Sequence, residues 1–451
     1  MKRTILVTAL ACWAACAGAL GCNSGVTPTP EPTGQPAKTP TATTAATTTA
    51  APTTSAAAAP SAQPSPDAGG PSEAAVTASN AFGLDLYRRL VEGAGNLAMS
   101  PASLSIALSM TYGGAKGDTA KEMAEVMHLP APDALHGGWA TVLSRWGKEM
   151  GKVELRVANR LFGEKSYQFE KPFLGLTEDR YAAPLEPRDF KNAPEAQRKY
   201  INGWVEERTK KRIVDLIPPP GINSDTRLVL ANAIYLKAPW DEPFNDKLTK
   251  EGTFYAGGTK EVQVPLMSKA AHMRYADTAE VELVELGYEG RQLAMLIALP
   301  KQRAGLAGVE KKLDEKMVRS WVEALKGKRV WLSLPKFKVD PAASLALKPH
   351  LQAMGMKLAF LRGKADFTAM TNPKSAEDRL NISNVFHKAF VAVDEKGTEA
   401  AAATAVVMAR AGAAPVEPQK VVVDHPFLFF IRDVETQALM FVGRVVDPSA
   451  S

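Results

Sequence analysis

The sequence contains very little cysteine. Only Cys12, Cys16 and Cys22 occur, all at the start of a chain of 451 residues. The rest of the chain can therefore form no disulfide within itself, no zinc or iron–sulfur site held by cysteine, and no cysteine nucleophile. Hydrophobic residues make up 45% and charged residues 23%, a balance that supports a large core and excludes a chain that is disordered throughout.

The motifs of several enzyme classes are absent as well. No Gly-x-Ser-x-Gly sequence supplies the nucleophile of an α/β-hydrolase. No His-Glu-x-x-His occurs, and the six histidines are too scattered to predict a metal site. The segment from Gly113 to Thr119 resembles a phosphate-binding loop only superficially, because it lacks the Gly-Lys-Ser/Thr ending and follows a helical pattern. We therefore expect no enzymatic activity, no metal and no cofactor.

The net charge of +6 is too small to predict binding to nucleic acid. Three basic and three acidic residues cancel within residues 1–77, so the remainder of the chain carries the whole excess. Two small basic clusters, Lys210–Arg212 and Lys326–Arg329, stand out. We interpret both as solvated helix ends or turns rather than as sites for a polyanion.

The N-terminus has the layout of a secretory signal. A short basic start is followed by an uncharged apolar stretch from Ile5 to Leu20. That stretch is shorter than the roughly 20 residues that a membrane-spanning helix needs. The pattern predicts a signal peptide over residues 1–21 and export of the rest.

The four residues Ala19-Leu20-Gly21-Cys22 resemble the cleavage box of bacterial lipoproteins, in which the cysteine becomes the lipid-bearing first residue. That family prefers leucine where Ala19 stands. The resemblance implies lipid attachment at Cys22 and a membrane-anchored lipoprotein, on the periplasmic or cell-surface face of an outer membrane. The alternative is plain secretion into the extracellular space, with cleavage after Ala17 or Ala19.

Residues 22–77 are dominated by threonine, alanine, proline and serine, with almost no charge and no hydrophobic period. Such a segment cannot bury enough apolar surface to offset the entropy lost on ordering. We expect a disordered tether with an r.m.s. span of about 40 Å.

Residues 78–451 have the pattern of one mixed domain without an internal linker. Helices are expected over Asn80–Glu92, from a Ser100 cap with Pro101 in the first turn, and over Asp118–Met127. Later runs are typical of strands, several of them apolar on both faces as in a covered sheet: Leu228–Leu236, Leu293–Leu299, Val330–Val339, Val385–Val393 and Phe427–Arg432. Helices followed by strands favour the α+β class.

The segment from Thr398 to Ala414 is unusual for a connection between two strands. It has no proline and only two charges, and every second residue from Thr398 to Met408 is small or apolar. This alternation is typical of a strand with one buried face. Two interpretations follow: an ordinary extra helix or strand, since alanine favours helices, or a loop that can become a strand.

Several stretches, in order along residues 78–451, resemble the serpin family. The matching residues are Asn96–Ser103 with Ala107, Leu108 and Gly114–Thr119; then Asn202, Trp204, Val205, Thr209, Ile213 and Leu216; then Asn232–Trp240, His387–Thr404 and Val421–Ile431 with its Asp424-His425-Pro426-Phe427. The resemblance covers essentially the whole body of the chain.

The resemblance implies a serpin fold of three β-sheets and eight or nine helices, with an exposed reactive-centre loop. It also implies inhibition of serine-type endopeptidases by a suicide mechanism, in which the cleaved loop inserts as a strand into the main sheet and traps the acyl-enzyme. The alternative is a non-inhibitory serpin that acts as a surface binding or scaffold protein. The expected partners are a target serine protease and the membrane, and we expect a monomer.

The resemblance also assigns residues to the loop. The hinge comprises Glu395, Gly397, Thr398, Glu399, Ala400, Ala401, Ala402, Ala403 and Thr404. The small side chains of Thr398 and Ala400–Ala403 favour insertion, and Gly397 gives the backbone freedom to turn. Family spacing places the reactive bond between Ala411 and Gly412, which implies an elastase- or subtilisin-like protease. If the bond is instead that between Arg410 and Ala411, the target is trypsin-like.

Other residues are implied to control the sheet. Trp240 and Lys336 should support the point where the loop enters, with Lys336 paired to Glu395. Ser100, Ser103, Asn232 and His387 should form a polar cluster beneath the point where the sheet opens. Helix capping and core hydrogen bonding are the plainer interpretation of that cluster.

Overall fold

The computed structural model describes residues 70–93, 95–148, 150–399 and 417–450. The helices in these ranges are α1 (Pro71–Leu90), α2 (Pro101–Tyr112), α3 (Gly117–Val126), α4 (Pro132–Trp146), α5 (Lys171–Tyr181), α6 (Pro194–Arg208), α7 (Leu306–Lys312), α8 (Glu315–Ala324) and α9 (Lys348–Met354), with short 3₁₀ turns η1 (Asp246–Leu248) and η2 (Leu358–Phe360). Helix α1 begins before the expected Asn80, and its buried Ala75 and Val76 belong to the core. Residues 71–77 are therefore helical, although the sequence pattern placed them in the tether.

The first six strands are β1 (Leu97–Met99), β2 (Glu154–Glu164), β3 (Glu186–Arg188), β4 (Leu228–Pro239), β5 (Lys250–Ala256) and β6 (Lys260–Asp277). The others are β7 (Val281–Gly287), β8 (Leu293–Pro300), β9 (Lys326–Pro335), β10 (Phe337–Val339), β11 (Leu345–Ala346), β12 (Asn384–Ala389), β13 (Val391–Asp394), β14 (Gly397–Thr398), β15 (Gln419–Val422), β16 (Phe427–Asp433) and β17 (Leu439–Val445).

Within the described ranges, hydrogen bonding joins these strands into two sheets. One sheet has the order β10-β13-β14-β4-β12-β11, with β2 also paired to β4 and β3 to β2. The other runs β1-β17-β16-β8-β7-β6-β9-β15, with β5 on β6. The long strand β6 pairs with β5 at its beginning, with β9 along its middle and with β7 at its end, so the third sheet expected from the sequence is continuous with the second.

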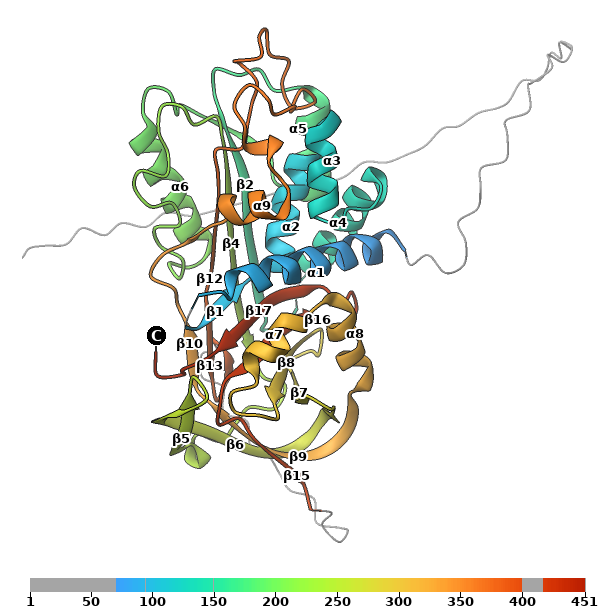
Figure 1. Cartoon of the computed structure of the whole chain (residues 1–451), viewed down its shortest axis with the longest axis vertical. Helices are drawn as coiled ribbons and strands as arrows, with labels where there is room; N and C mark the ends of the chain where they lie inside the picture. Colours follow the sequence, from blue (N-terminus) through green and yellow to red (C-terminus); the bar gives the residue numbers. More distant parts are fainter. Residues whose placement is uncertain (1–69, 94, 149, 400–416, 451) are drawn as a thin grey trace, which may run out of the picture. The chain divides into compact units, whose positions relative to one another are not determined.

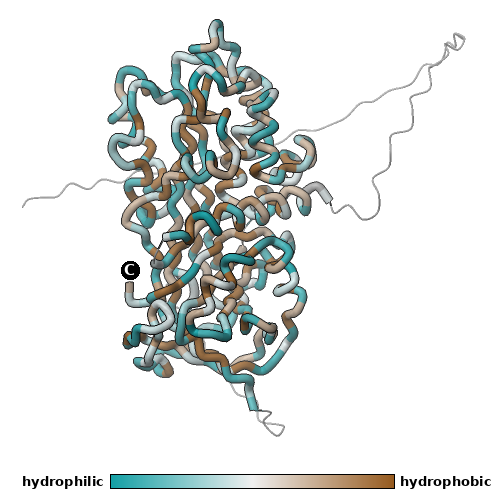
Figure 2. Tube along the Cα trace, viewed as in Figure 1, coloured by the Kyte–Doolittle hydropathy of each residue, from teal (hydrophilic) through white to brown (hydrophobic). Residues whose placement is uncertain are grey.

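Helix α2 lies between the two sheets and contacts β2 and β4 on one side and β17 on the other (Figure 1). Its residues from Pro101 to Thr111 are all buried. A helix packed on all sides has no face toward solvent, which explains why its sequence carries no charged face. Ser100 caps it as expected, since its side-chain oxygen accepts the Ser103 amide. Figure 2 shows hydrophobic segments running along the central strands.

Strand β4 is covered on both faces, which explains its unbroken apolar sequence. Alternate residues such as Leu230 and Ile234 belong to the large core shared with α2. The intervening Val229, Ala231 and Ala233 pack in a second core that includes residues of α6. The prediction of a buried central strand is confirmed.

Two runs expected as single strands are each divided. Val330–Val339 is split between β9 and β10, which belong to different sheets. Val385–Val393 is split at Phe390, where the chain leaves its parallel pairing with β4 and begins to pair with β10 and β14. A change of the paired strand depends on tertiary contacts, and hydrophobic periodicity along the sequence does not indicate it.

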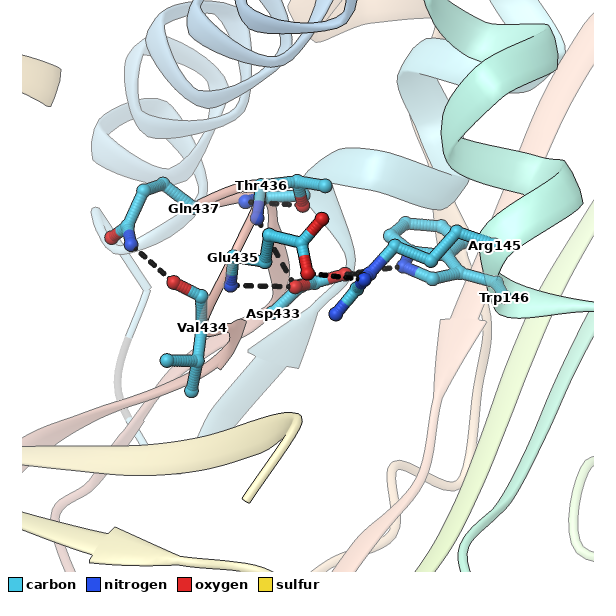
Figure 3. A network of polar contacts seen from close by, with 8 residues as sticks. Arg145, Trp146, Asp433, Val434, Glu435, Thr436 and Gln437 are labelled. Atoms are coloured by element: carbon cyan, nitrogen blue, oxygen red, sulfur yellow. Dashed lines mark hydrogen bonds and ion pairs between the residues drawn. The ribbon is translucent and has the colours of Figure 1, made fainter. Parts of the chain in front are cut away.

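A buried carboxylate ties α4 to the turn after β16 (Figure 3). Asp433 Oδ2 accepts the indole N–H of Trp146 at 2.9 Å and the Nε of Arg145 at 3.2 Å. Its Oδ1 accepts the amides of Glu435 and Thr436. Because both oxygens are satisfied, this charge is held in the interior without an unpaired polar atom.

Candidate functional site

The strand that lies beside β4 differs between the two ends of the sheet. Strand β12 pairs directly with β4 from Asn384↔Val229 to Ala389↔Ile234. Beyond that point β14 lies between β4 and β13, the strand that follows β12, because Gly397 and Thr398 pair with Pro239 and Ala238 of β4 and also with β13. The central sheet therefore already holds the first two residues of a strand that could continue between β4 and β12.

Four side chains from α2, β4, β12 and β2 join in a buried network where β4 and β12 are still paired. Asn232 donates through Nδ2 to Ser103 Oγ and to Asn159 Oδ1, both at 2.7 Å. Asn159 in turn donates to the Ser103 carbonyl at 3.0 Å. His387, directly opposite Asn232, bonds to the Asn232 amide oxygen. The contact between Asn232 and His387 adds a side-chain link to the backbone pairing of the two strands.

The ring of His387 has a defined proton arrangement. Its Nε2 accepts the backbone amide of Ser100 at 3.0 Å, so the proton resides on Nδ1 and is donated to Asn232. Complete burial lowers the pKa of His387 to about 3. The cluster therefore requires the neutral imidazole.

Trp240 lies where β14 enters the sheet. Its ring stacks on Tyr288 with centroids 4.6 Å apart, and its indole N–H donates to the Asp394 carbonyl at 3.0 Å. The hydroxyl of Tyr288 lies 2.6 Å from the hydroxyl of Thr398. These contacts fix the turn between β13 and β14 against the end of β4.

Glu395 is buried in that turn and carries two side-chain partners. Lys336 Nζ lies 2.9 Å from Oε2, and the Thr249 hydroxyl donates to Oε1 at 2.8 Å. Burial by itself raises the pKa of this carboxyl, but the hydrogen bonds from Lys336 and Thr249 outweigh it and hold the pKa below its ordinary value. The charged carboxylate is thus the form that the site stabilises.

Gly397 cannot be replaced without moving the backbone. Its φ of 153° is one that side chains with a Cβ rarely adopt, and a Cβ placed there would lie 2.1 Å from the Ala238 carbonyl oxygen. The glycine lets the returning strand approach β4 closely.

No candidate for metal binding occurs in the described ranges: no three histidine, cysteine, aspartate or glutamate side chains there gather as metal ligands do. In the same ranges no helix combines the length and apolar character needed to cross a membrane.

Comparison with known proteins identifies the fold. The family described as "Serpin (serine protease inhibitor)" matches residues 77–448. The chain belongs to the serpin family. This serpin is 38% identical to a serpin-like protein of Thermococcus kodakarensis, over 84% of this chain and 87% of the relative. It is also 38% identical to the leukocyte elastase inhibitor of Bos taurus, over 83% of this chain and 100% of the relative.

Solved structures agree with this assignment. Uncleaved ovalbumin superposes with a TM-score of 0.75 and 29% identity, covering 83% of this serpin and 100% of ovalbumin. Human thyroxine-binding globulin complexed with thyroxine superposes with a TM-score of 0.75 and 28% identity, covering 84% and 99%. The expected serpin fold is thereby confirmed.

The structure brings together the residues of both expected clusters. Ser100, Ser103, Asn232 and His387 share one hydrogen-bond network, and Lys336 pairs with Glu395 beside Trp240. Their roles in sheet opening remain predictions. The hinge residues Ala400, Ala401, Ala402, Ala403 and Thr404, the bait residues Arg410, Ala411 and Gly412, and Cys22 lie outside the described residues.

Three residues of the site were not predicted from the sequence. Asn159 is central to the polar cluster, and its only signal is a polar residue within an apolar strand pattern. Tyr288 and Thr249 contact Thr398 and Glu395 across more than 100 residues of sequence, which no local pattern indicates.

Proposed function

We propose that this serpin inhibits serine-type endopeptidases by suicide-substrate trapping. A protease cleaves the loop that follows Glu399, remains bound as an acyl-enzyme, and is displaced as the freed loop inserts between β4 and β12. The observation that supports this most strongly is β14, which already occupies the space between β4 and β13 and ends where the loop begins.

The register of β14 defines where an inserted loop would lie. Each step forward from Thr398↔Ala238 and Thr398↔Val393 moves one step back along both neighbours. Continued in this way, Thr404 comes to lie between Asn232 and His387, which now pair with each other. Insertion would thus separate Asn232 from His387 and place Thr404 between them, where its hydroxyl can bond to either side chain.

The side chains of the loop suit this path. Thr398 is buried and pairs with Ala238, which belongs to the core shared with α2, so Ala400, Ala402, Thr404, Val406 and Met408 would face that core. All are small or apolar. New ladder hydrogen bonds and buried apolar surface drive the insertion, and the native form is then held kinetically.

A test is to incubate the full chain with trypsin, pancreatic elastase and subtilisin separately, followed by boiling and an SDS gel. A band at the summed mass establishes covalent trapping. Mapping the attached residue distinguishes Ala411, expected for elastase or subtilisin, from Arg410, expected for trypsin. Cleavage within residues 405–415 without such a band for any of the three proteases contradicts the proposal and favours the non-inhibitory binding protein.

We propose further that the chain is exported and anchored by a lipid on Cys22, with residues 23–70 as a tether. The sequence of the signal and its cleavage box supports this. Metabolic labelling with a radioactive fatty acid should mark the wild-type chain and leave Cys22→Ser unlabelled. An unlabelled wild-type chain in the culture medium would support plain secretion instead.

A further inference from the structure

Glu399 turns the chain out of the sheet. Its amide still donates to the Ala392 carbonyl at 3.0 Å, so the hydrogen-bond ladder of β14 extends to this residue. Its φ of 50°, however, is a left-handed conformation that residues other than glycine seldom adopt. The strand therefore ends here because of the backbone of Glu399, not for lack of a partner strand.

Arg212 holds the side chain of Glu399. Its guanidinium, in the segment after α6, forms an ion pair with the Glu399 carboxylate and lies 5.6 Å from the centre of the Phe390 ring. Only 13% of the Glu399 side chain is exposed, and among the described residues its buried Oε2 has no hydrogen-bond partner. Burial raises the pKa of Glu399, whereas Arg212 and, more weakly, Lys237 lower it, so the charge depends chiefly on Arg212.

Lys237 occupies the position that Glu399 would meet in an extended strand. Gly397 pairs with Pro239 and Thr398 with Ala238, so the next pair in this register is Glu399 with Lys237. Directly opposed residues of an antiparallel pair share a face with their Cβ atoms about 5 Å apart. A cavity of ≈ 560 Å³, lined by Lys237, Lys338, Arg212 and Glu399 among others, leaves space for the exchange.

We propose that Arg212 and Lys237 are successive partners of the Glu399 carboxylate and together set the rate at which the loop enters the sheet. In the native protein Arg212 holds Glu399 in its left-handed conformation and keeps β14 two residues long. As residue 399 becomes extended, the carboxylate leaves Arg212 and meets Lys237. Both are positioning residues, because they act on the hinge and not on the scissile bond. The inference rests on the proposed function and names the contacts that regulate it.

The test measures spontaneous conversion to the inserted form, without any protease. The full chain is held at a fixed elevated temperature, and samples on a transverse urea gel give the fraction that resists unfolding. Arg212→Ala should convert about fivefold faster than the wild type, as expected for the loss of one partly exposed ion pair. Glu399→Gln loses the contacts with both Arg212 and Lys237, so it should convert more slowly than Arg212→Ala. Arg212→Lys should restore most of the wild-type half-life. The double variant of Arg212→Ala and Glu399→Gln should match Glu399→Gln alone, because Arg212 acts only through this carboxylate.

Lys237→Met should act in the opposite direction, with slower conversion and a lower melting temperature of the inserted form. Lys210→Ala is the matched control, because Lys210 lines the same cavity but pairs with Glu154. Equal half-lives for Arg212→Ala and Lys210→Ala would overturn the proposal. So would faster conversion of Lys237→Met, which indicates general destabilisation, or the absence of conversion in every variant. Failure of the proposed function is seen separately, as the lack of a covalent adduct.

Discussion

Reversing the charge of Glu395 should open the sheet at its entry point. Glu395 is 8% exposed and has two side-chain partners, Lys336 at 2.9 Å and Thr249 at 2.8 Å. Glu395→Gln removes the ion pair with Lys336 and the charge of the group that accepts the Thr249 hydroxyl, which lowers the stability of the closed sheet by about 2 kcal/mol once the 39% exposure of the Lys336 side chain is considered. Glu395→Lys adds a like charge beside Lys336, for a total of about 3 kcal/mol.

This destabilisation acts on the closed, native sheet and not on an inserted one, so we expect polymers or a latent form. The assay is a native gel of the purified variants after incubation, together with the covalent yield against the target protease. Glu395→Lys should form polymers fastest, Glu395→Gln more slowly, and Lys336→Glu combined with Glu395→Lys should recover part of the native band.

Asp340→Lys is the control, since Asp340 forms an ion pair with Lys338 that is more exposed and lies outside the turn. It should stay monomeric. If Glu395→Lys also stays monomeric and fully inhibitory, the pair with Lys336 does not hold the sheet closed and the reasoning is wrong.

Three further predictions concern the same sheet. Because His387 is neutral in the fold with a pKa of about 3, its contribution is complete above the unfolded value of about 6.5 and is lost as pH falls toward 3; the free energy of unfolding should therefore fall by up to about 1.4 kcal/mol per pH unit between these values. His387→Gln should remove this fall and leave only the part due to His136, whose burial lowers its pKa to about 4. Asn159→Ala leaves Asn232 without one acceptor in the buried cluster, so the free energy of unfolding should fall by about 1–3 kcal/mol and the melting temperature should be lower. An unchanged melting temperature would argue that water or another group accepts the Asn232 hydrogen bond instead. Thr398 is 1% exposed, so Thr398→Arg should be cleaved without trapping the protease while Thr398→Ser still traps it; a normal stoichiometry of inhibition in the arginine variant would refute insertion at this position.

Local sequence patterns predicted much of the fold. The Ser100 cap, the helix that follows it and the two-sided apolar run of β4 result from short-range chemistry and periodicity, and the structure confirms them. The ends were less well predicted: helix α1 starts at Pro71 because Ala75 and Val76 pack into the core, within an alanine-rich segment that resembles the tether in composition.

The site was only partly predictable. The resemblance to serpins supplied the residues of the polar cluster and the pairing of Lys336 with Glu395. It did not supply Asn159, Tyr288 or the partners of Glu399, because these contacts join residues 73, 110 and 187 positions apart. Arg212 belonged to a basic cluster interpreted as solvated, and its half-exposed guanidinium is consistent with that, yet it is paired with the hinge.

The central claim is that cleavage of the loop is followed by its insertion between β4 and β12. The most direct measurement is the melting temperature of the full chain before and after cleavage within residues 405–415 by a protease that is then removed. The account predicts that the cleaved protein melts tens of degrees higher, because a new strand adds ladder hydrogen bonds and buried apolar side chains on both sides. A cleaved protein that melts at the same temperature as the intact one, or below it, would contradict insertion and with it the inhibitory mechanism.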